Sequence, residues 1–444
     1  MEYTMSRFTK VIKSQVDGNL LMFNSITGVD SLVCVEDQGT IDCVYEILSA
    51  GEKNDKNEQI HEILVQKGHL VPKNRDEQKY AEELIAREKY SPVLRLTIMP
   101  TEDCNFRCGY CYEEHKPGVM SESVQEAIIK YVRKNIHNYA ELRVSWFGGE
   151  PLEAKEIIYR LSTKLLHICQ AAKRKYSAGI TTNGYDLNMD TFLALLNCKV
   201  YDFQITIDGP QDIHDKLRKQ KNGCGTYNRI MENLISIKEN CKKSYFTIAL
   251  RTNFTNESVC KLDDYVKTYI SLFGKDKRFR MFPHYMGKWS EERFDSSLDK
   301  QLLDKKDLGG LYAKVMNYRD ELSLDINLNF LSSMGLCPAG YSFSYVIGVN
   351  GELYKCTQDF EFEDNKIGTL YQNGSMFIDQ EKHRKWYFNL LNHKCENCFF
   401  LGACQGRNCP KYIIQNDGVG NCSDQKNNIE LVLDLLDRNN YMHI

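Results

Sequence analysis

Strands that alternate with amphipathic helices fill the middle of the chain, from about residue 91 to residue 325. Six segments have the composition of buried strands, namely 93–100, 141–151, 177–184, 200–210, 245–255 and 278–285. Helical periodicity marks intervening segments at 123–136, 156–174 and 226–240. Six β–α units predict an α/β fold with a parallel sheet, either doubly wound or a partial barrel. In such folds the functional loops lie at the carboxyl ends of the strands.

Charge and hydropathy exclude several functional classes. The formal net charge of −3 lacks the basic excess that nucleic-acid binding usually needs. No apolar run is long enough to span a membrane, and the N-terminus lacks the apolar core of a secretory signal. We therefore expect a cytoplasmic protein that binds neither nucleic acid nor membrane. The 17 cysteines are then not expected to form a disulfide framework, so cysteines that group together indicate metal or cluster ligation.

One cysteine group directly follows the first predicted strand of the alternating region. Its sequence is CNFRCGYCY, in which Cys104, Cys108 and Cys111 have the spacing C-x3-C-x2-C. Three thiolates can hold three irons of a [4Fe–4S] cluster and leave the fourth iron open, whereas most electron-transfer clusters use four cysteines. The alternative is a zinc site completed by His115, although zinc sites favour paired C-x2-C elements.

Short polar motifs end the next three predicted strands. Gly148, Gly149 and Glu150 lie in GGEP, Asn183 in TTNG and Asp208 in TIDGP. Together with the cysteine triad, these motifs resemble the radical S-adenosylmethionine (SAM) superfamily over residues 93–285. The resemblance implies that the GGE backbone and carboxylate contact the SAM amino group, which suits glycines that permit close approach. It also makes Asn183 and Asp208 polar contacts to the cofactor; the alternative is turn chemistry, because Asn-Gly and Asp-Gly favour turns.

The same resemblance assigns three more side chains and a reaction. Tyr110 corresponds to an aromatic position beside the adenine, and Arg218 and Arg251 are candidates for the methionine carboxylate. Arginine offers a bidentate fork for that group, and an exposed salt bridge is the alternative. The implied reaction is reductive cleavage of SAM to methionine and a 5′-deoxyadenosyl radical that abstracts a substrate hydrogen. The cysteine triad is then catalytic, and a flavodoxin or ferredoxin would supply the electron.

A second cysteine group lies in the last quarter of the chain, which is rich in Gly, Asn and aromatic residues. A segment with so little periodicity is expected to use metal ligation in place of an aliphatic core. The cysteine spacing resembles the SPASM domain, which carries two auxiliary [4Fe–4S] clusters in peptide-modifying members, and a zinc ribbon is the alternative. The implied ligands are Cys395, Cys398, Cys404 and Cys422 for the distal cluster and Cys337, Cys356 and Cys409 for the proximal cluster. Fully ligated members have one more cysteine, so the proximal cluster here is expected to have an open iron, which could bind a substrate thiolate. The alternatives are a non-cysteine ligand and a cluster that only relays electrons.

Residues 1–90 are predicted to form a separate module. Strand-like alternation at 10–15, 19–28 and 31–36 precedes a helix at 40–51, a helix and short strand at 57–71, and a linking helix at 76–90. The order resembles the winged-helix-like α+β domain of ribosomal peptide (RiPP) maturases, which captures a leader peptide as an added strand. A structural cap on the barrel is the alternative.

These inferences predict three domains, namely a leader-recognition domain at 1–90, a radical SAM partial (β/α)6 barrel at 91–325 and an irregular SPASM domain at 326–444. The expected function is a peptide maturase that binds a ribosomal precursor peptide and installs a crosslink, with a thioether favoured over carbon–carbon crosslinking or epimerisation. Anaerobic sulfatase maturation is an alternative, but such relatives carry an aspartate directly after the position of Cys356, where this chain has Thr357 and places Asp359 two residues later. A zinc-stapled binding protein without catalysis is the remaining possibility.

Overall fold

The computed structural model describes residues 2–51, 57–304, 335–388, 394–405, 409–420 and 422–438, together with residues 311, 314, 315, 317, 318, 321, 322 and 391. The chain forms two compact units. The first contains the described residues of Met1–Ser91, Asn327–Ser342 and Lys385–Ile444, and the second contains those of Pro92–Ile326 and Phe343–Arg384. The segment predicted as a C-terminal domain, 326–444, is therefore shared between the two units.

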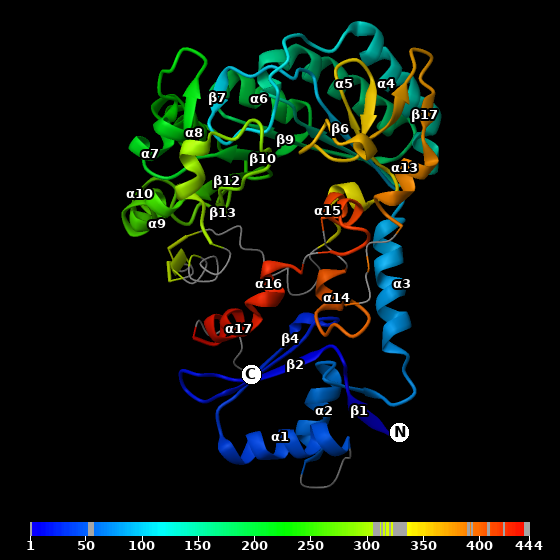
Figure 1. The fold of residues 1–444 in the computed structure, drawn as a ribbon, viewed down its shortest axis with the longest axis vertical. Coiled ribbons are helices and arrows are strands. Elements are labelled where there is room, and N and C mark those ends of the chain that lie inside the picture. Colours follow the sequence, from blue (N-terminus) through cyan, green and yellow to red (C-terminus); the bar gives the residue numbers. More distant parts are fainter. Residues whose placement is uncertain are drawn as a thin grey trace. The chain divides into compact units, whose positions relative to one another are not determined.

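The second unit is built on a mixed sheet whose described strands have the order β13-β12-β10-β9-β8-β6-β14-β15-β16-β17 (Figure 1). Six parallel neighbours form its larger part: β6 (Val93–Ile98), β8 (Glu141–Trp146), β9 (Lys175–Thr182), β10 (Val200–Thr206), β12 (Thr247–Phe254) and β13 (Phe279–Tyr285). The α/β fold and the six predicted strands are thus confirmed. The remaining strands are β14 (Ser344–Ile347), which runs parallel to β6, and the antiparallel β15 (Glu352–Tyr354), β16 (Lys366–Leu370) and β17 (Met376–Ile378).

Helices join the parallel strands, as expected for β–α units. They are α4 (Glu122–Asn135), α5 (Lys155–Ala171), α6 (Met189–Asn197), α7 (Gln211–Leu217), α8 (Tyr227–Asn240), α9 (Asn256–Cys260) and α10 (Leu262–Leu272), and α13 (Gln380–Lys385) follows β17. Side-chain caps begin several of them, such as Ser121 at α4 and Asn188 at α6. Because all six strands run the same way, their carboxyl ends meet at one edge, and the predicted motifs follow these ends.

The first unit contains a three-stranded antiparallel sheet, β2–β3–β4, with helices on both faces. Its N-terminal elements are β1 (Tyr3–Met5), β2 (Thr9–Lys13), β3 (Leu20–Asn24), β4 (Gly28–Val35), α1 (Gln38–Ala50), α2 (Glu58–Gln66), β5 (Leu70–Pro72) and α3 (Glu77–Lys89). Its C-terminal elements are α14 (Leu401–Cys404), α15 (Pro410–Gln415), α16 (Asp424–Asn427) and α17 (Ile429–Arg438).

The two faces of this sheet pack into different cores. On one face Leu21 and Phe23 of β3 pack with Phe400 and with Leu433 of α17. On the other face neighbouring β3 residues, such as Met22, pack with α1, α2 and β5. Successive side chains of a strand point to opposite faces of the sheet, and in β3 the side chains on both faces are buried. Helices from the N-terminal and C-terminal parts of the chain pack against the two faces.

The helix predicted at 40–51 is confirmed as α1, and a glycine ends it. Asp37 caps the N-terminus of α1, and Gly51 ends the helix with φ +69°. A Cβ atom at Gly51 would lie 2.1 Å from the carbonyl oxygen of Tyr3, so both the backbone angle and the space require glycine. Within the described part of the chain, no helix is long and apolar enough to cross a membrane.

Candidate active site

The triad loop follows β6 and is held by a short antiparallel ribbon. β7 (Phe106–Cys108) pairs with β11 (Arg218–Gln220), and Cys108 lies opposite Arg218. The Gly109 N–H donates to the carbonyl of Leu217 at 3.1 Å. This ribbon brings Arg218, which follows α7, to the level of the second cysteine.

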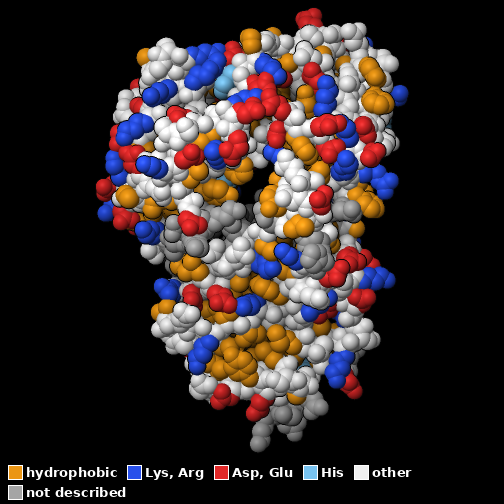
Figure 2. Space-filling view, in the orientation of Figure 1, with side chains coloured by type: hydrophobic (Ala, Val, Ile, Leu, Met, Phe, Trp, Pro, Cys, Tyr) orange, Lys and Arg blue, Asp and Glu red, His pale blue; other side chains and the backbone are white. Residues whose placement is uncertain are grey.

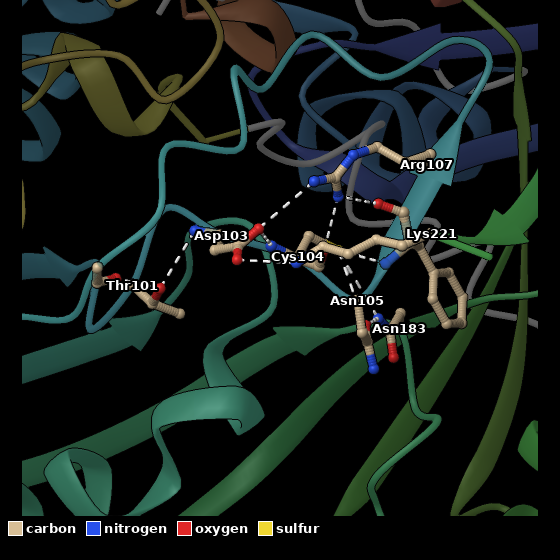
Figure 3. A network of polar contacts seen from close by, with 9 residues as sticks. Thr101, Asp103, Cys104, Asn105, Arg107, Asn183 and Lys221 are labelled. Atoms are coloured by element: carbon tan, nitrogen blue, oxygen red, sulfur yellow. Dashed lines mark hydrogen bonds and ion pairs between the residues drawn. The ribbon is translucent and has the colours of Figure 1, made fainter.

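Cys104 is buried, with 6% of its surface exposed, and N–H groups point at its sulfur. The Phe106 N–H lies 3.3 Å from Sγ, and the Asn183 amide nitrogen lies 3.9 Å from it. Asn183 also donates to the Asn105 side chain at 2.7 Å, so the end of β9 is joined to the triad loop (Figure 3). Burial raises the pKa of the unliganded Cys104 thiol, whereas N–H donors at sulfur stabilise an iron-bound thiolate.

A charged cluster fixes the start of the loop. Asp103 accepts the Cys104 N–H at 2.8 Å and pairs with Lys221 at 2.8 Å and with Arg107 at 3.6 Å (Figure 3). The Lys221 backbone N–H donates to the carbonyl of Asn105 at 3.0 Å. The ribbon and these ion pairs thus clamp the backbone on both sides of Cys104.

The GGEP turn packs directly against the triad loop. A Cβ atom at Gly148 would lie 2.1 Å from the carbonyl oxygen of Thr101, and one at Gly149 would lie 2.1 Å from that of Asp103. The Glu150 N–H donates to the same Asp103 carbonyl at 2.8 Å. The two glycines therefore permit close approach to the chain's own backbone, and this contact positions Cys104.

The Glu150 carboxylate is fully buried and joins two strand ends. It accepts from the Leu152 N–H at 2.9 Å, the Thr182 hydroxyl at 2.6 Å and the Asn183 N–H at 2.6 Å. Burial raises its pKa to about 7, and these three donors oppose that shift. Both oxygens thus have protein partners, while the predicted contact to a SAM amino group stays a prediction.

Tyr110, Asp208 and Arg218 form one buried network at the ends of β10 and β12. The Tyr110 hydroxyl donates to Asp208 Oδ2 and accepts from Arg218 Nη1 at 2.8 Å. Asp208 Oδ1 accepts from the Asn253 N–H at 2.9 Å. Burial raises the pKa of Asp208, and the Arg218 charge opposes that shift. Asp208 therefore joins two strand ends instead of only closing a turn.

Arg218 and Arg251 both lie at the site. Arg218 is 7% exposed, and its Nε has no hydrogen-bond partner in the described structure. Arg251 Nε donates to Asn253 Oδ1 at 2.9 Å, and Arg251 Nη2 lies 3.1 Å from His284 Nδ1. Neither forms an ion pair among the residues that the structure describes, so the surface salt bridge expected as an alternative is not seen. Their contact to a methionine carboxylate stays a prediction.

The four cysteines predicted for the distal cluster all lie in the first unit. Cys398 packs against Phe8, Ala81, Ile85 and Leu401 together with Cys395, and against the core around Phe400 together with Cys404. Cys422 lies two residues before the start of α16 and accepts a hydrogen bond from Lys426. Cys395 and Cys398 are therefore on the loop before α14, Cys404 is the last residue of α14, and Cys422 is on the segment that leads into α16 and α17.

The three cysteines predicted for the proximal cluster lie in both units. Cys337 and Cys409 belong to the first unit, where each precedes a short helical turn, and Cys356 belongs to the second. Asn365, which is fully buried, accepts from the Cys356 N–H at 2.8 Å and donates to the Cys356 carbonyl at 2.9 Å. These contacts organise the loop from Cys356 to Asn365.

The cysteines fit iron–sulfur ligation by the chemistry of their side chains. No disulfide joins any cysteine of the chain. In the described conformation no group of three or more His, Cys, Asp or Glu side chains lies together as a metal site. Three cysteines on one clamped loop, of which Cys104 has N–H donors at its sulfur, are nevertheless a donor set that a [4Fe–4S] cluster can use.

Sequence reasoning missed several residues of this network. Asn105 and Lys221 fix the triad loop, and Asn253 contacts Asp208. Glu113 is 8% exposed with Oε1 unpaired in the described structure, and burial raises its pKa to about 8. Asn253 could have been found, because it lies near the end of a predicted strand, as Asn183 and Asp208 do. The others depend on contacts between segments distant in sequence.

Comparison with known proteins identifies related sequences and folds. Residues 98–266 match the family model described as Radical SAM superfamily. The cysteine-type anaerobic sulfatase-maturating enzyme of Clostridium novyi (strain NT) is 26% identical over 342 residues, which cover 70% of this chain and 87% of that protein. The serine-type anaerobic sulfatase-maturating enzyme of Bacteroides thetaiotaomicron is 24% identical over 357 residues, which cover 69% of this chain and 80% of that protein.

A solved structure described as native anSMEcpe with bound AdoMet and Cp18Cys peptide is similar to this chain with a TM-score of 0.58. It is 18% identical, and the match covers 78% of this chain and 96% of that chain. At this identity the likeness shows a shared fold.

Proposed function

Because the protein is a radical SAM enzyme, we propose that it modifies a ribosomal precursor peptide by installing a crosslink, with a thioether as the favoured product. Support for a peptide substrate comes from the sulfatase-maturating relatives and from the structural neighbour with a bound peptide. Support for a precursor peptide comes from the N-terminal sheet, in which β2 and β4 are the edge strands.

The residues at the strand ends suggest how the chain would hold the cofactors. Cys104, Cys108 and Cys111 would bind the radical [4Fe–4S] cluster. When bound, the cluster and SAM supply a 5′-deoxyadenosyl radical that abstracts a substrate hydrogen. The Tyr110–Asp208–Arg218 network would orient SAM beside the triad, and the buried strand ends would exclude water. Replacing Cys104 with Ala is expected to abolish 5′-deoxyadenosine formation, measured by chromatography, whereas Cys224→Ala, an exposed cysteine of the same unit, should retain it.

The single observation that carries leader recognition is the burial of both faces of the β2–β3–β4 sheet. Helices of the first unit cover both faces, so an incoming strand can pair with this sheet only at β2 or β4. Figure 2 shows hydrophobic side chains gathered on the surface over β2 and toward α1. An extended leader peptide with alternating apolar residues would pair its backbone with the N–H and C=O groups of the edge strand and would place its apolar side chains on such a surface.

Hydrogen exchange of the full-length protein tests this recognition. Adding the leader peptide should protect backbone amides of β2 or β4, because a paired strand satisfies edge groups. A leader of scrambled sequence is the matched control and should leave exchange unchanged. Equal protection by both peptides, or protection confined to the second unit, would contradict leader recognition by this sheet.

Thioether formation gives the experiment a distinct product. Joining a cysteine sulfur to carbon would remove one hydrogen atom from carbon and one proton and one electron from the thiol side. With SAM bound, the hydrogen atom together with one electron supplied by the reductant would leave as 5′-deoxyadenosine and methionine, and the electron released on forming the carbon–sulfur bond would replace the one consumed. Anaerobic incubation with the precursor, SAM and dithionite should therefore yield a peptide that has lost two hydrogen atoms and one alkylatable thiol. An unchanged mass would count against crosslinking.

Sulfatase maturation is the second candidate, and the two curated relatives favour it. It would convert a cysteine or serine to formylglycine, so the product would carry an aldehyde that reacts with hydrazide reagents. Thr357 after Cys356 favours crosslinking, because the aspartate expected at that position is absent. Sulfatase maturation would be the correct assignment if a sulfatase peptide becomes hydrazide-reactive while a precursor peptide stays unchanged.

Two auxiliary [4Fe–4S] clusters and a flavodoxin or ferredoxin donor complete the proposal. Anaerobically reconstituted protein should then contain about twelve irons and little zinc, since each of three clusters holds four irons. A colourless, zinc-loaded protein would exclude the radical mechanism and favour a zinc-stapled binding protein. Retained activity with either purified donor in place of dithionite would test the electron source.

A further inference from the structure

Lys426 lies beside two cysteines, and nothing described so far explains its place. Its Nζ donates to Cys422 Sγ at 3.5 Å. The same ammonium also interacts with the Cys398 thiol. One cation thus interacts with thiols from two segments that are far apart in the sequence.

Local structure and packing together set the position of Lys426. It follows Cys422 by one helical turn, and its backbone N–H donates to Ser423 Oγ at 3.3 Å. Directly after α16, Ile429 and Leu433 of α17 enter the core that contains Phe400, and Cys398 packs against this same core. The lysine is therefore held between two anchored segments of the first unit.

The partners that the structure describes for the Lys426 ammonium differ from those of an ordinary surface lysine. They are cysteine sulfurs, whereas Lys10, on the same unit, pairs with the Glu430 carboxylate of α17 at 2.8 Å. A cation whose partners are sulfur atoms is expected where those sulfurs carry negative charge, as iron-bound thiolates do.

We propose that Lys426 is a positioning residue of the distal auxiliary cluster, where its ammonium donates N–H···S hydrogen bonds to the Cys398 and Cys422 thiolates and favours the reduced cluster. The inference rests on the proposed ligand set. Reduction by one electron, supplied by dithionite in the test below, adds one negative charge to the cluster. A positive charge at hydrogen-bond distance stabilises that charge, and hydrogen bonds to sulfur raise the reduction potential of such clusters.

The test measures the auxiliary clusters without the radical cluster. The parent is the full-length protein with Cys104→Ala, Cys108→Ala and Cys111→Ala, reconstituted anaerobically and titrated with dithionite under electron paramagnetic resonance. In Lys426→Met the equilibrium constant for reducing one auxiliary cluster should fall on the order of tenfold, which is about 59 mV for one electron. Lys426→Arg keeps a cationic donor and should stay close to the parent. Lys164→Met, on an exposed position of α5, is the matched control and should not change either couple.

The possible results distinguish absence of the distal cluster from absence of an effect of Lys426 on it. A parent that binds no auxiliary cluster, by iron content and Mössbauer spectra, would remove the ligand set and the inference with it. A parent with two auxiliary clusters whose potentials do not move in Lys426→Met would overturn the inference alone, as would an equal shift in Lys164→Met. If Lys426→Met loses iron, the reduction potential of the auxiliary cluster is measured in Lys426→Gln instead, because glutamine removes the positive charge but keeps an N–H donor. Loss of the cluster from the Met, Gln and Arg variants would make Lys426 a packing residue and would also overturn the proposal.

Discussion

At the scale of single residues, the strand-end motifs act through contacts to the triad loop. Gly149 and Glu150 contact the Asp103 carbonyl, and Asn183 reaches Cys104. A motif expected to present groups to a cofactor therefore also places the residues that precede the first cysteine. The network around Tyr110 is of the same kind, because Asp208 joins the ends of two strands.

Replacing Gly149 with Ala is expected to displace the triad loop. The new Cβ would lie 2.1 Å from the Asp103 carbonyl oxygen, so the loop or the turn must move. The variant should lose about four of its irons after reconstitution, as one cluster is lost, and should fail to cleave SAM. Gly39→Ala, where the nearest atom to the new Cβ is 3.3 Å away, is the control. Full iron content in Gly149→Ala would show that the turn does not position the cysteines.

Replacing Asp208 with Asn should weaken SAM binding while sparing the cluster. The amide retains one acceptor oxygen, so either Tyr110 or the Asn253 N–H loses its partner, at a cost of about 1–3 kcal/mol. The KM for SAM should rise, with an unchanged cluster absorption spectrum. Tyr110→Phe should act through the same Tyr110–Asp208 hydrogen bond. In the double variant the loss of SAM-binding free energy should therefore be smaller than the sum of the losses in the two single variants. Additive effects would contradict a shared network.

At the scale of elements, β2 and β4 are joined by a buried histidine as well as through β3. His69 contacts the Thr9 hydroxyl at 3.2 Å and the Ser31 carbonyl at 2.8 Å. Its burial lowers its pKa to about 4. The folded unit therefore holds His69 neutral at pH values where an unfolded segment would bind a proton.

Acid should consequently loosen this sheet. The stabilisation is present above pH 6.5, the ordinary pKa of histidine, and is lost as pH falls toward 4, because only the unfolded state gains the proton. Between pH 7 and pH 5 the loss is about 2 kcal/mol. Hydrogen exchange of β2–β4, corrected for intrinsic rates, measures it. His69→Gln should remove the pH dependence, and His167→Gln, exposed on α5, should retain it; the same dependence in both variants would refute the assignment.

At the scale of the whole molecule, the two ends of the chain share one core in the first unit. The N-terminal sheet packs on Phe400 and α17, directly beside Cys398 and Cys404. The module predicted to recognise a leader and the loop predicted to bind the distal cluster are thus parts of one unit. Deleting residues 1–85 would remove that shared core, so binding experiments on the full-length protein are the cleaner test of leader recognition.

Truncating Phe400 should therefore affect two properties at once. Phe400→Ala removes a fully buried ring and should cost about 3–5 kcal/mol. Faster exchange in β2–β4 and loss of about four auxiliary irons should occur together, since the sheet and the cysteine loop share this side chain. Phe203→Ala, equally deep in the second unit, should leave the exchange of β2–β4 unchanged. Separate loss of only one property would argue against a common core.

The sequence by itself determined the six-strand α/β region, the triad loop and the placement of the motifs at strand ends. These follow from periodicity and from glycine and asparagine signals that act over a few residues. The three-cluster ligand set, the leader-binding role, the electron donor and a cytoplasmic location stay predictions. Only the tertiary structure revealed that β14 extends the parallel sheet beside β6, that GGEP packs on Asp103, and that α17 covers the N-terminal sheet. Those contacts join segments distant along the chain, and their energy comes from burial and close packing, which local sequence patterns do not encode.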